Sequence, residues 1–94
     1  MMDTRWVEDF LCLAEMRSFK RSAFARNASQ AAFSRRIQSL ESWIGAELVD
    51  RSSMPLSLTP AGHTFRCVAV NIVRQVDLAR NLVQTHGEAI KHIA

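Results

Sequence analysis

The sequence contains no apolar run near the roughly 18 to 20 residues that a membrane-spanning helix needs. Its N-terminus, M-M-D-T-R-W, also lacks the basic start and the following apolar run of a signal peptide. Cysteine is scarce, since Cys12 and Cys67 are the two, and both fall in apolar helical patterns. We expect both to be small, reduced core residues of a cytoplasmic protein, with a disulfide or redox-sensing pair as the alternative.

Motifs for catalysis and metal binding are also missing. The chain has no nucleophile elbow, no paired acids with an orienting partner and no glycine loop that cradles a phosphate. Its histidines, His63, His86 and His92, and its two cysteines do not have the spacing of metal ligands. These absences predict a protein that is not an enzyme and that needs no cofactor or metal.

Acidic residues are absent from residues 17–36, a stretch that carries half of the chain's twelve lysines and arginines. The six basic residues there are Arg17, Lys20, Arg21, Arg26, Arg35 and Arg36. Residues 37–50 reverse the balance, with three acids and no base. A solvated surface is the ordinary interpretation of a charge run. Local clustering is also what a phosphate backbone attracts, and the modest net charge of +3 hides it.

What the chain does contain is enough for one small folded domain: 94 residues, 48% of them hydrophobic. Residues 29–45 predict a helix with a cap at each end, Ser29 at the start and Gly45 at the end. The spacing of a buried stripe is carried by Phe33, Ile37, Leu40 and Ile44. The opposite side, near the N-terminus, carries Gln30, Ser34, Arg35 and Gln38. A helix with amides, a hydroxyl and a guanidinium opposite its buried face suits a DNA groove.

Two shorter helices are expected before this one. Residues 4–16 place Trp6, Phe10, Leu13 and Ala14 on one face, and Asp3 or Thr4 can cap them. Ser18 caps a second helix to about residue 26, with Phe19, Ala23 and Phe24 pointing inward. Asn27 suits the left-handed turn that follows. Helix, tight turn and capped helix is the helix-turn-helix arrangement.

After Gly45 the pattern changes to short extended runs at residues 48–51 and 56–58, which predict a β-hairpin or wing. Pro55 restricts its strand to an edge position. Arg51 is placed to reach a phosphate or the minor groove. Thr59 and Pro60 then predict the start of a long helix.

This long helix carries an apolar stripe with alternating spacings of four and three residues from Phe65 onward. Its positions are Phe65, Ala69, Ile72, Val76, Ala79, Val83, His86, Ile90 and Ile93. About 33 residues of helix span roughly 50 Å, longer than a small domain can cover. The stripe therefore predicts pairing with a second copy of the chain. For His86 a side chain hydrogen-bonded across the pair is favoured over a pH switch.

The chain resembles the N-terminal region of LysR-type transcriptional regulators over about residues 5–90. Four blocks carry the resemblance: A-E-M-R-S-F-K-R-S-A (14–23), S-Q-A-A-F-S-R-R-I-Q-S-L-E (29–41), I-G-A-E-L-V-D-R (44–51) and L-T-P-A-G (58–62). The resemblance implies a mainly α winged helix-turn-helix over residues 1–59 and a linker helix over residues 60–94. It also implies antiparallel pairing of linker helices, a bacterial source and a downstream effector-binding domain, with any small-molecule or redox effector bound there. Tetramers in that family involve the downstream domain.

The resemblance also implies roles for individual residues. Positions that match the family's DNA contacts are Ser29, Gln30, Ser34, Arg35 and the wing residue Arg51, and Thr59 matches the cap of the linker helix. Further candidates for contact are Lys20, Arg21, Arg26, Ala31, Arg36 and Gln38. Ala31 replaces a common proline and Val49 a common phenylalanine. Arg26 replaces a common leucine, and packing on the core and clamping a phosphate are both open for it.

Two functions of different classes follow. The favoured function is sequence-specific binding of double-stranded DNA, at a two-fold-symmetric site, by a homodimeric regulator. The alternative is a winged-helix module that docks an acidic protein. Because docking faces are rich in apolar and aromatic anchors, the polar side of residues 29–45 favours DNA.

Overall fold

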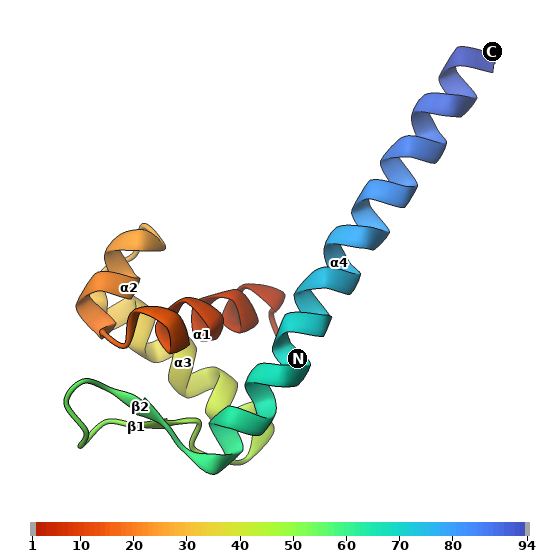
Figure 1. Cartoon of the computed structure of the whole chain (residues 1–94). Coiled ribbons are helices and arrows are strands. Elements are labelled where there is room, and N and C mark those ends of the chain that lie inside the picture. The colour runs from red at the N-terminus through yellow and green to blue at the C-terminus, as the bar shows by residue number, and fades with distance from the viewer. Residues whose placement is uncertain (1, 94) are drawn as a thin grey trace.

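The computed structural model describes the backbone of residues 2–93 and the side chains of residues 2–86. In this range the elements are α1 (Thr4–Met16), α2 (Phe19–Ala25), α3 (Gln30–Ile44), β1 (Val49–Asp50), β2 (Ser57–Leu58) and α4 (Pro60–Ile93). Three short helices and the hairpin form a head, residues 2–59, and α4 leaves it as a long rod (Figure 1). The molecule measures 58 × 26 × 23 Å. The mainly helical, winged fold expected from the sequence is confirmed.

Short-range signals set the helix ends. Asp3 accepts a hydrogen bond from the Arg5 N–H at 2.9 Å, and Ser18 accepts one from the Arg21 N–H at 3.1 Å. At the other end of α3, Gly45 takes a left-handed conformation with φ 86°. These caps satisfy backbone groups that would otherwise lack partners at helix ends. The expected boundaries of α1, α2 and α3 are confirmed to within one or two residues.

The core lies between α1 and α3 and is closed by the base of α4. Phe10 and Leu13 of α1 meet Phe33 and Ile37 of α3, and all four are fully buried. Phe65 of α4 adds an edge-on contact to Phe10, with ring centroids 5.3 Å apart. Burial of this stripe fixes the rotation of α3, so its opposite side faces outward.

Two inward residues expected from the sequence lie on the surface instead. Phe24 is 86% exposed, because α2 has just seven residues and its buried face is already completed by Ser22 and Ala23. Cys67 is exposed as well, whereas Cys12 is half-buried and lies against Met16. Two residues along a helix correspond to about 200°, so Cys67 lies opposite the face that carries Phe65. The prediction of burial was wrong for Phe24 and Cys67.

The hairpin pairs Val49 with Leu58 and Asp50 with Ser57 in antiparallel register. Val49 is buried on the core and so fills the position of the larger phenylalanine expected there. At the turn, the Asp50 carboxylate accepts hydrogen bonds from the hydroxyl and the N–H of Ser52 at 2.6 and 3.0 Å. These bonds lower the pKa of Asp50 below its usual value. The predicted wing is confirmed, and its tip is held by its own side chains.

The base of α4 is attached tightly to the head. Thr59 accepts a hydrogen bond from the Gly62 N–H at 3.0 Å and donates one to the Glu47 carbonyl at 2.6 Å. Gly62 lies so close to the Leu48 carbonyl oxygen that a Cβ atom there would overlap it. The helix begins at Pro60, the residue predicted to start it, and only glycine fits two residues later.

The apolar stripe of α4 divides into two parts. Ala69 is fully buried in its own chain, and Phe65 and Ile72 pack partly on the same core. The seam prediction was therefore wrong for Ala69, which has no surface left for a partner. The later positions Val76, Ala79, Val83 and His86 are exposed, Val83 by 71%. Ile90, like His92 and Ile93, lies outside the described side chains.

Candidate nucleic-acid interface

The outward side of α3 carries the polar residues expected there. Gln30, Ala31, Arg35 and Gln38 are exposed, and Ser34 is partly buried. Ser29 uses its hydroxyl oxygen as the cap of α3, accepting the Ala32 N–H at 3.1 Å. Its hydroxyl proton can still be donated to a ligand. These side chains offer donors and acceptors along one strip of helix, which is the arrangement that reads base edges.

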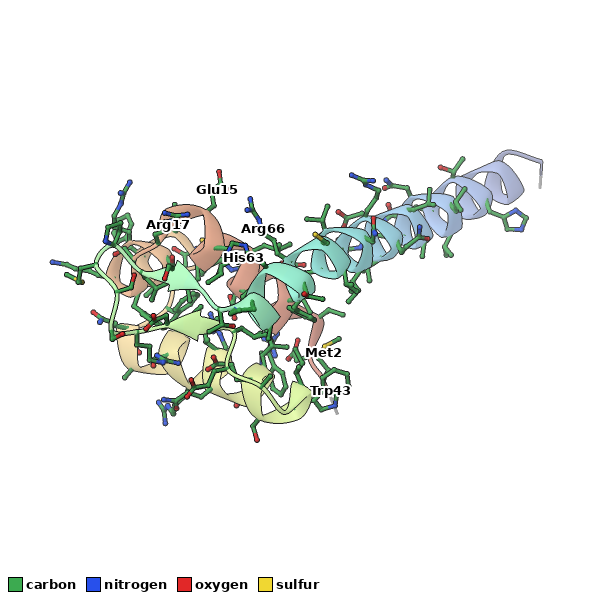
Figure 2. All side chains as sticks on the ribbon, turned by 60° about the horizontal axis from the view of Figure 1, so that its bottom comes forward. Met2, Glu15, Arg17, Trp43, His63 and Arg66 are labelled. Carbon is green, nitrogen blue, oxygen red and sulfur yellow. The ribbon has the colours of Figure 1, made fainter. Side chains whose placement is uncertain are left out.

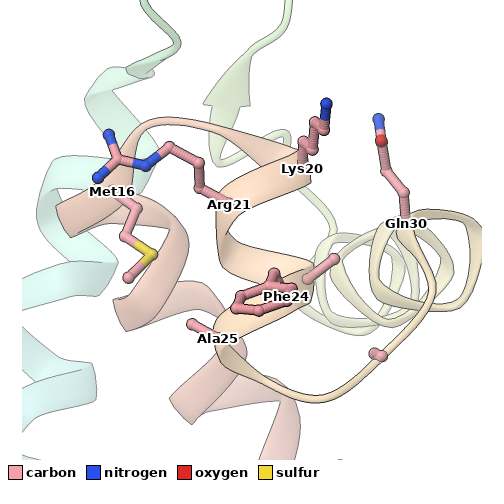
Figure 3. Close-up of a pocket in the computed structure, with 8 residues that line it drawn as sticks. Met16, Lys20, Arg21, Phe24, Ala25 and Gln30 are labelled. Atoms are coloured by element: carbon pink, nitrogen blue, oxygen red, sulfur yellow. The ribbon is translucent and has the colours of Figure 1, made fainter.

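A groove runs between α2, the start of α3 and the wing. Its lining includes Lys20, Arg21, Gln30, Ser34, Arg51, Met54 and Pro55. Figure 3 is a close-up of an adjoining hollow that shares Lys20, Arg21 and Gln30 with this groove, and it shows Lys20 and Gln30 extending in the same direction from α2 and α3. Residues from three parts of the sequence thus meet at one surface, and five of the eleven predicted contact residues line it.

Arg51 is the wing residue that faces this groove, and two contacts hold it. Its guanidinium lies 4.7 Å from the centroid of the Phe19 ring and donates to Glu41 at 3.2 Å. The other oxygen of Glu41 accepts the Leu48 N–H at 2.7 Å. Glu41 thus ties the start of the hairpin and Arg51 to α3. Since the Arg51 side chain is still 39% exposed, it can present a positive edge to a ligand.

Two of the predicted DNA contacts, Arg26 and Arg36, form ion pairs with a buried acid. Both donate to the fully buried carboxylate of Asp9, Arg26 at 2.8 Å and Arg36 at 2.7 Å. The bond to Asp9 raises the pKa of Arg26 above its usual value. The two alternatives considered for Arg26, a stem packed on the core with its head in solvent and a phosphate clamp, did not include this ion pair. Both arginines are thus paired with acids of α1, and their contact with DNA stays a prediction.

Four other cations of the basic stretch keep their charge available. Arg17, Lys20, Arg21 and Arg35 are exposed and form no ion pair with the acids that the structure describes. Arg17 lies on the outside of the head, at the left-handed turn that ends α1 (Figure 2). It was not among the residues singled out as contacts, although the charge run contained it. Free positive charge therefore borders the start of α3 and the wing.

Sequence patterns did not reveal the part that two acids play in this site. Asp9 and Glu41 are acids that act across long separations in the chain, and no local spacing marks them. A second hollow, which shares Arg35 and Gln38 with the outward side of α3, brings Trp6 and Trp43 beside them. Trp43 is 56% exposed there, and its position one residue before the buried stripe was the available signal.

The described residues were also considered for metal binding and for membrane spans. Among the residues that the structure describes, no group of three or more histidines, cysteines, aspartates and glutamates is arranged to hold a metal ion. No described helix is long and apolar enough to cross a membrane.

The fold and the site together define a winged helix-turn-helix protein, with α2 and α3 as the two-helix unit and β1 and β2 as the wing. Residues 4–63 match the family model for bacterial regulatory helix-turn-helix proteins of the lysR family. The chain belongs to this family.

Individual relatives agree with this assignment. The chain is 41% identical over 86 residues to the HTH-type transcriptional regulator YjiE of Escherichia coli, covering 92% of this chain and 28% of that protein. A crystal structure of Vibrio fischeri DarR in complex with DNA matches with a TM-score of 0.92 and 43% identity, over 94% of this chain and 30% of that one. The BenM DNA-binding domain bound to its catB site 1 DNA matches with a TM-score of 0.84 and 32% identity, over 88% and 89%. The chain thus spans about a third or less of the full-length curated relatives that it matches.

Proposed function

We propose that this chain is the DNA-binding part of a dimeric transcriptional regulator that recognises a specific double-stranded site. The observation that supports it best is the outward side of α3, where Gln30, Ser34 and Arg35 lie beside unpaired cations. Relatives solved with DNA have the same fold. The proposal includes no enzymatic step and places the protein in the cytoplasm.

In this proposal α3 enters the major groove. Gln30 pairs with adenine through its N6 and N7 atoms, and Arg35 pairs with guanine through O6 and N7. Gln38 lies one turn further along the same side of the helix and extends the reading strip. Ser29, Ser34 and the backbone N–H groups at Gln30 and Ala31 meet phosphate oxygens, because the start of a helix favours anions.

The wing and α2 supply contacts that do not depend on sequence. Lys20 and Arg21 border the groove next to Gln30 and suit the phosphates that flank the base contacts. Arg51 presents its free edge to the backbone or the minor groove. Met54 is 94% exposed at the wing tip, so the contact made there is apolar rather than charged. These residues set affinity and register, and α3 sets the choice of bases.

The exposed part of α4 supplies the dimer. From Val76 onward its larger apolar side chains are exposed in the described chain, and a second copy provides a matching surface. Two copies related by a two-fold axis place two recognition helices on one duplex, so the DNA site carries two half-sites. The chain spans about a third or less of the length of its curated relatives. We therefore propose an effector-binding domain, with its small-molecule or redox ligand, and any tetramer only for a longer protein that contains this chain.

The test is selection of bound duplexes from a random DNA pool at near-physiological salt. Enrichment of a motif with two separated half-sites supports the proposal, because only base contacts by a dimer produce it. Recovery of unenriched DNA, with binding that disappears as salt rises, reduces the interaction to its electrostatic part and contradicts sequence-specific binding by this chain.

Single substitutions assign the reading residues. Gln30→Ala is expected to cost about 1 to 3 kcal/mol of discrimination at one base pair of the selected site. Arg51→Ala should weaken binding to all sequences about equally. Gln84→Ala, an exposed position on α4, is the matched control and should change neither. Unaltered base preference in Gln30→Ala would show that another residue reads the site.

A protein-docking module was the alternative from the sequence, and the polar strip on α3 gives it no support. Capture of an acidic protein by the Gln30 side of α3, with no enrichment of DNA, would reverse this conclusion.

A further inference from the structure

Asp9 is a fully buried carboxylate at the junction of the three head helices. Its Oδ1 accepts the Nε–H of Arg26 at 2.8 Å and an NH2 proton of Arg36 at 3.3 Å, and its Oδ2 accepts the Nε–H of Arg36 at 2.7 Å. Arg26 also donates to Glu8 at 3.2 Å. A buried charge is stable when paired and hydrogen-bonded in this way.

The two arginines sit at positions that matter for the recognition helix. Arg26 is the residue that ends α2, directly before Asn27, whose left-handed backbone (φ 55°) makes the turn into α3. Arg36 lies in α3 next to Arg35 and two residues after Ser34. One carboxylate in α1 therefore holds the end of α2 and the middle of α3 at the same time.

We propose that Asp9 is a positioning residue for sequence recognition, which sets the placement of α3 relative to α2 and keeps Arg26 and Arg36 away from phosphates. This inference rests on the proposed DNA binding and adds a specificity determinant that does not touch DNA. The bond to Arg36 uses two nitrogens of one planar guanidinium, so it restrains orientation as well as distance.

Loss of the carboxylate has two consequences that act in the same direction. Bidentate base contacts need side chains held within about half an ångström, so a looser α3 weakens binding to the correct site. The released Arg26 and Arg36 side chains can then reach phosphates of any sequence, which strengthens non-specific binding and makes it more dependent on salt. The ratio of specific to non-specific affinity falls for both reasons.

The test compares Asp9→Asn with Glu8→Gln in the whole chain. Each removes one negative charge from the same region, but Glu8 is half-exposed and contacts Arg26 alone, so only Asp9→Asn frees α3. Dissociation constants are measured for the selected site and for a scrambled duplex across a range of salt. We expect the ratio to fall about tenfold in Asp9→Asn and to stay near the wild-type value in Glu8→Gln.

Arg36→Lys separates positioning from folding. It keeps a positive charge at residue 36 and leaves the bond between Asp9 and Arg26 in place, but it removes the planar two-bonded fork. We expect a reduced ratio with an unaltered salt dependence. Thermal unfolding of each variant shows whether it folds. If Asp9→Asn does not fold, the affinity ratio of Arg36→Lys still tests the proposal.

Amide NMR shifts of α3 without DNA provide a readout that does not depend on the proposed function. We expect shifts at Ser34 and Arg35 in Asp9→Asn and Arg36→Lys but not in Glu8→Gln. A wild-type chain that discriminates no sequence contradicts the proposed function, while these shifts still test the clamp. A wild-type ratio in Asp9→Asn and Arg36→Lys, or an equal loss in Glu8→Gln, would overturn the role given to Asp9.

Discussion

The two parts of α4 carry the same apolar spacing in opposite surroundings. Over residues 61–73 the stripe is taken up by the head, and Ala69 has no exposed surface. Over residues 74–86 the stripe continues at Val76 and Val83, which are exposed. The comparison shows that an apolar period predicts burial of a face but does not say which molecule buries it. The expected seam is one stripe whose first part is buried by its own chain and whose later part is exposed in it.

One negative charge placed in each part of α4 should have very different effects on folding. Ala69→Asp is expected to lower the free energy of unfolding by about 4 kcal/mol or more, because the carboxylate has no partner in the core. Val83→Asp should leave the unfolding of the monomeric head within about 0.5 kcal/mol. Urea unfolding followed by tryptophan fluorescence measures both, at a concentration where the wild type is also monomeric.

The Val83→Asp variant also tests the dimer. Val83→Asp is expected to be a monomer in sedimentation under conditions where the wild type pairs. Ile72→Asp would be a poorer probe, because Ile72 packs partly on its own head and its loss mixes folding with assembly. A Val83→Asp protein that still dimerises would move the interface away from the later stripe.

Features that depend on residues close together in the sequence could be predicted from it, and features that depend on distant residues could not. Caps at Ser18, Ser29 and Gly45 depend on residues within a few positions, so spacing alone gave the helix bounds. The core stripe of α3 could also be predicted from the sequence, since burial repeats with the helical period. With its core face fixed, the opposite polar face of α3 followed.

Interactions between residues far apart in the sequence could not be predicted from it. Asp9 meets Arg26 and Arg36 across 17 and 27 residues, so nothing local separates these two arginines from Lys20 or Arg35. The charge run therefore overstated the positive surface. Phe24 was misplaced for a related reason, because how many faces a seven-residue helix buries depends on its neighbours. Composition counts charges, and tertiary contacts decide which of them remain free.

A smaller effect is expected at the base of α4. Gly62→Ala is expected to lower the free energy of unfolding by about 3 kcal/mol, since its Cβ would overlap the Leu48 carbonyl oxygen, a backbone atom that cannot rotate away. Gly45→Ala is the matched control. It meets nothing within 4 Å, and its φ of 86° should cost about 1 kcal/mol. Equal losses in the two variants would mean that α4 can shift on the head.

The smallest expected effect concerns the cap that joins α4 to the head. Thr59→Ala removes the hydroxyl that bonds the Gly62 N–H and the Glu47 carbonyl, and we expect a loss of about 1 kcal/mol in urea unfolding. Thr59→Ser keeps the hydroxyl and should recover most of it. Thr64→Ala removes an exposed hydroxyl that bonds the Pro60 carbonyl and should change little. The cap acts only at the base of α4, so dimer formation by the later stripe should be unaltered in all three variants. A weakened dimer in Thr59→Ala would show that the two parts of α4 are coupled.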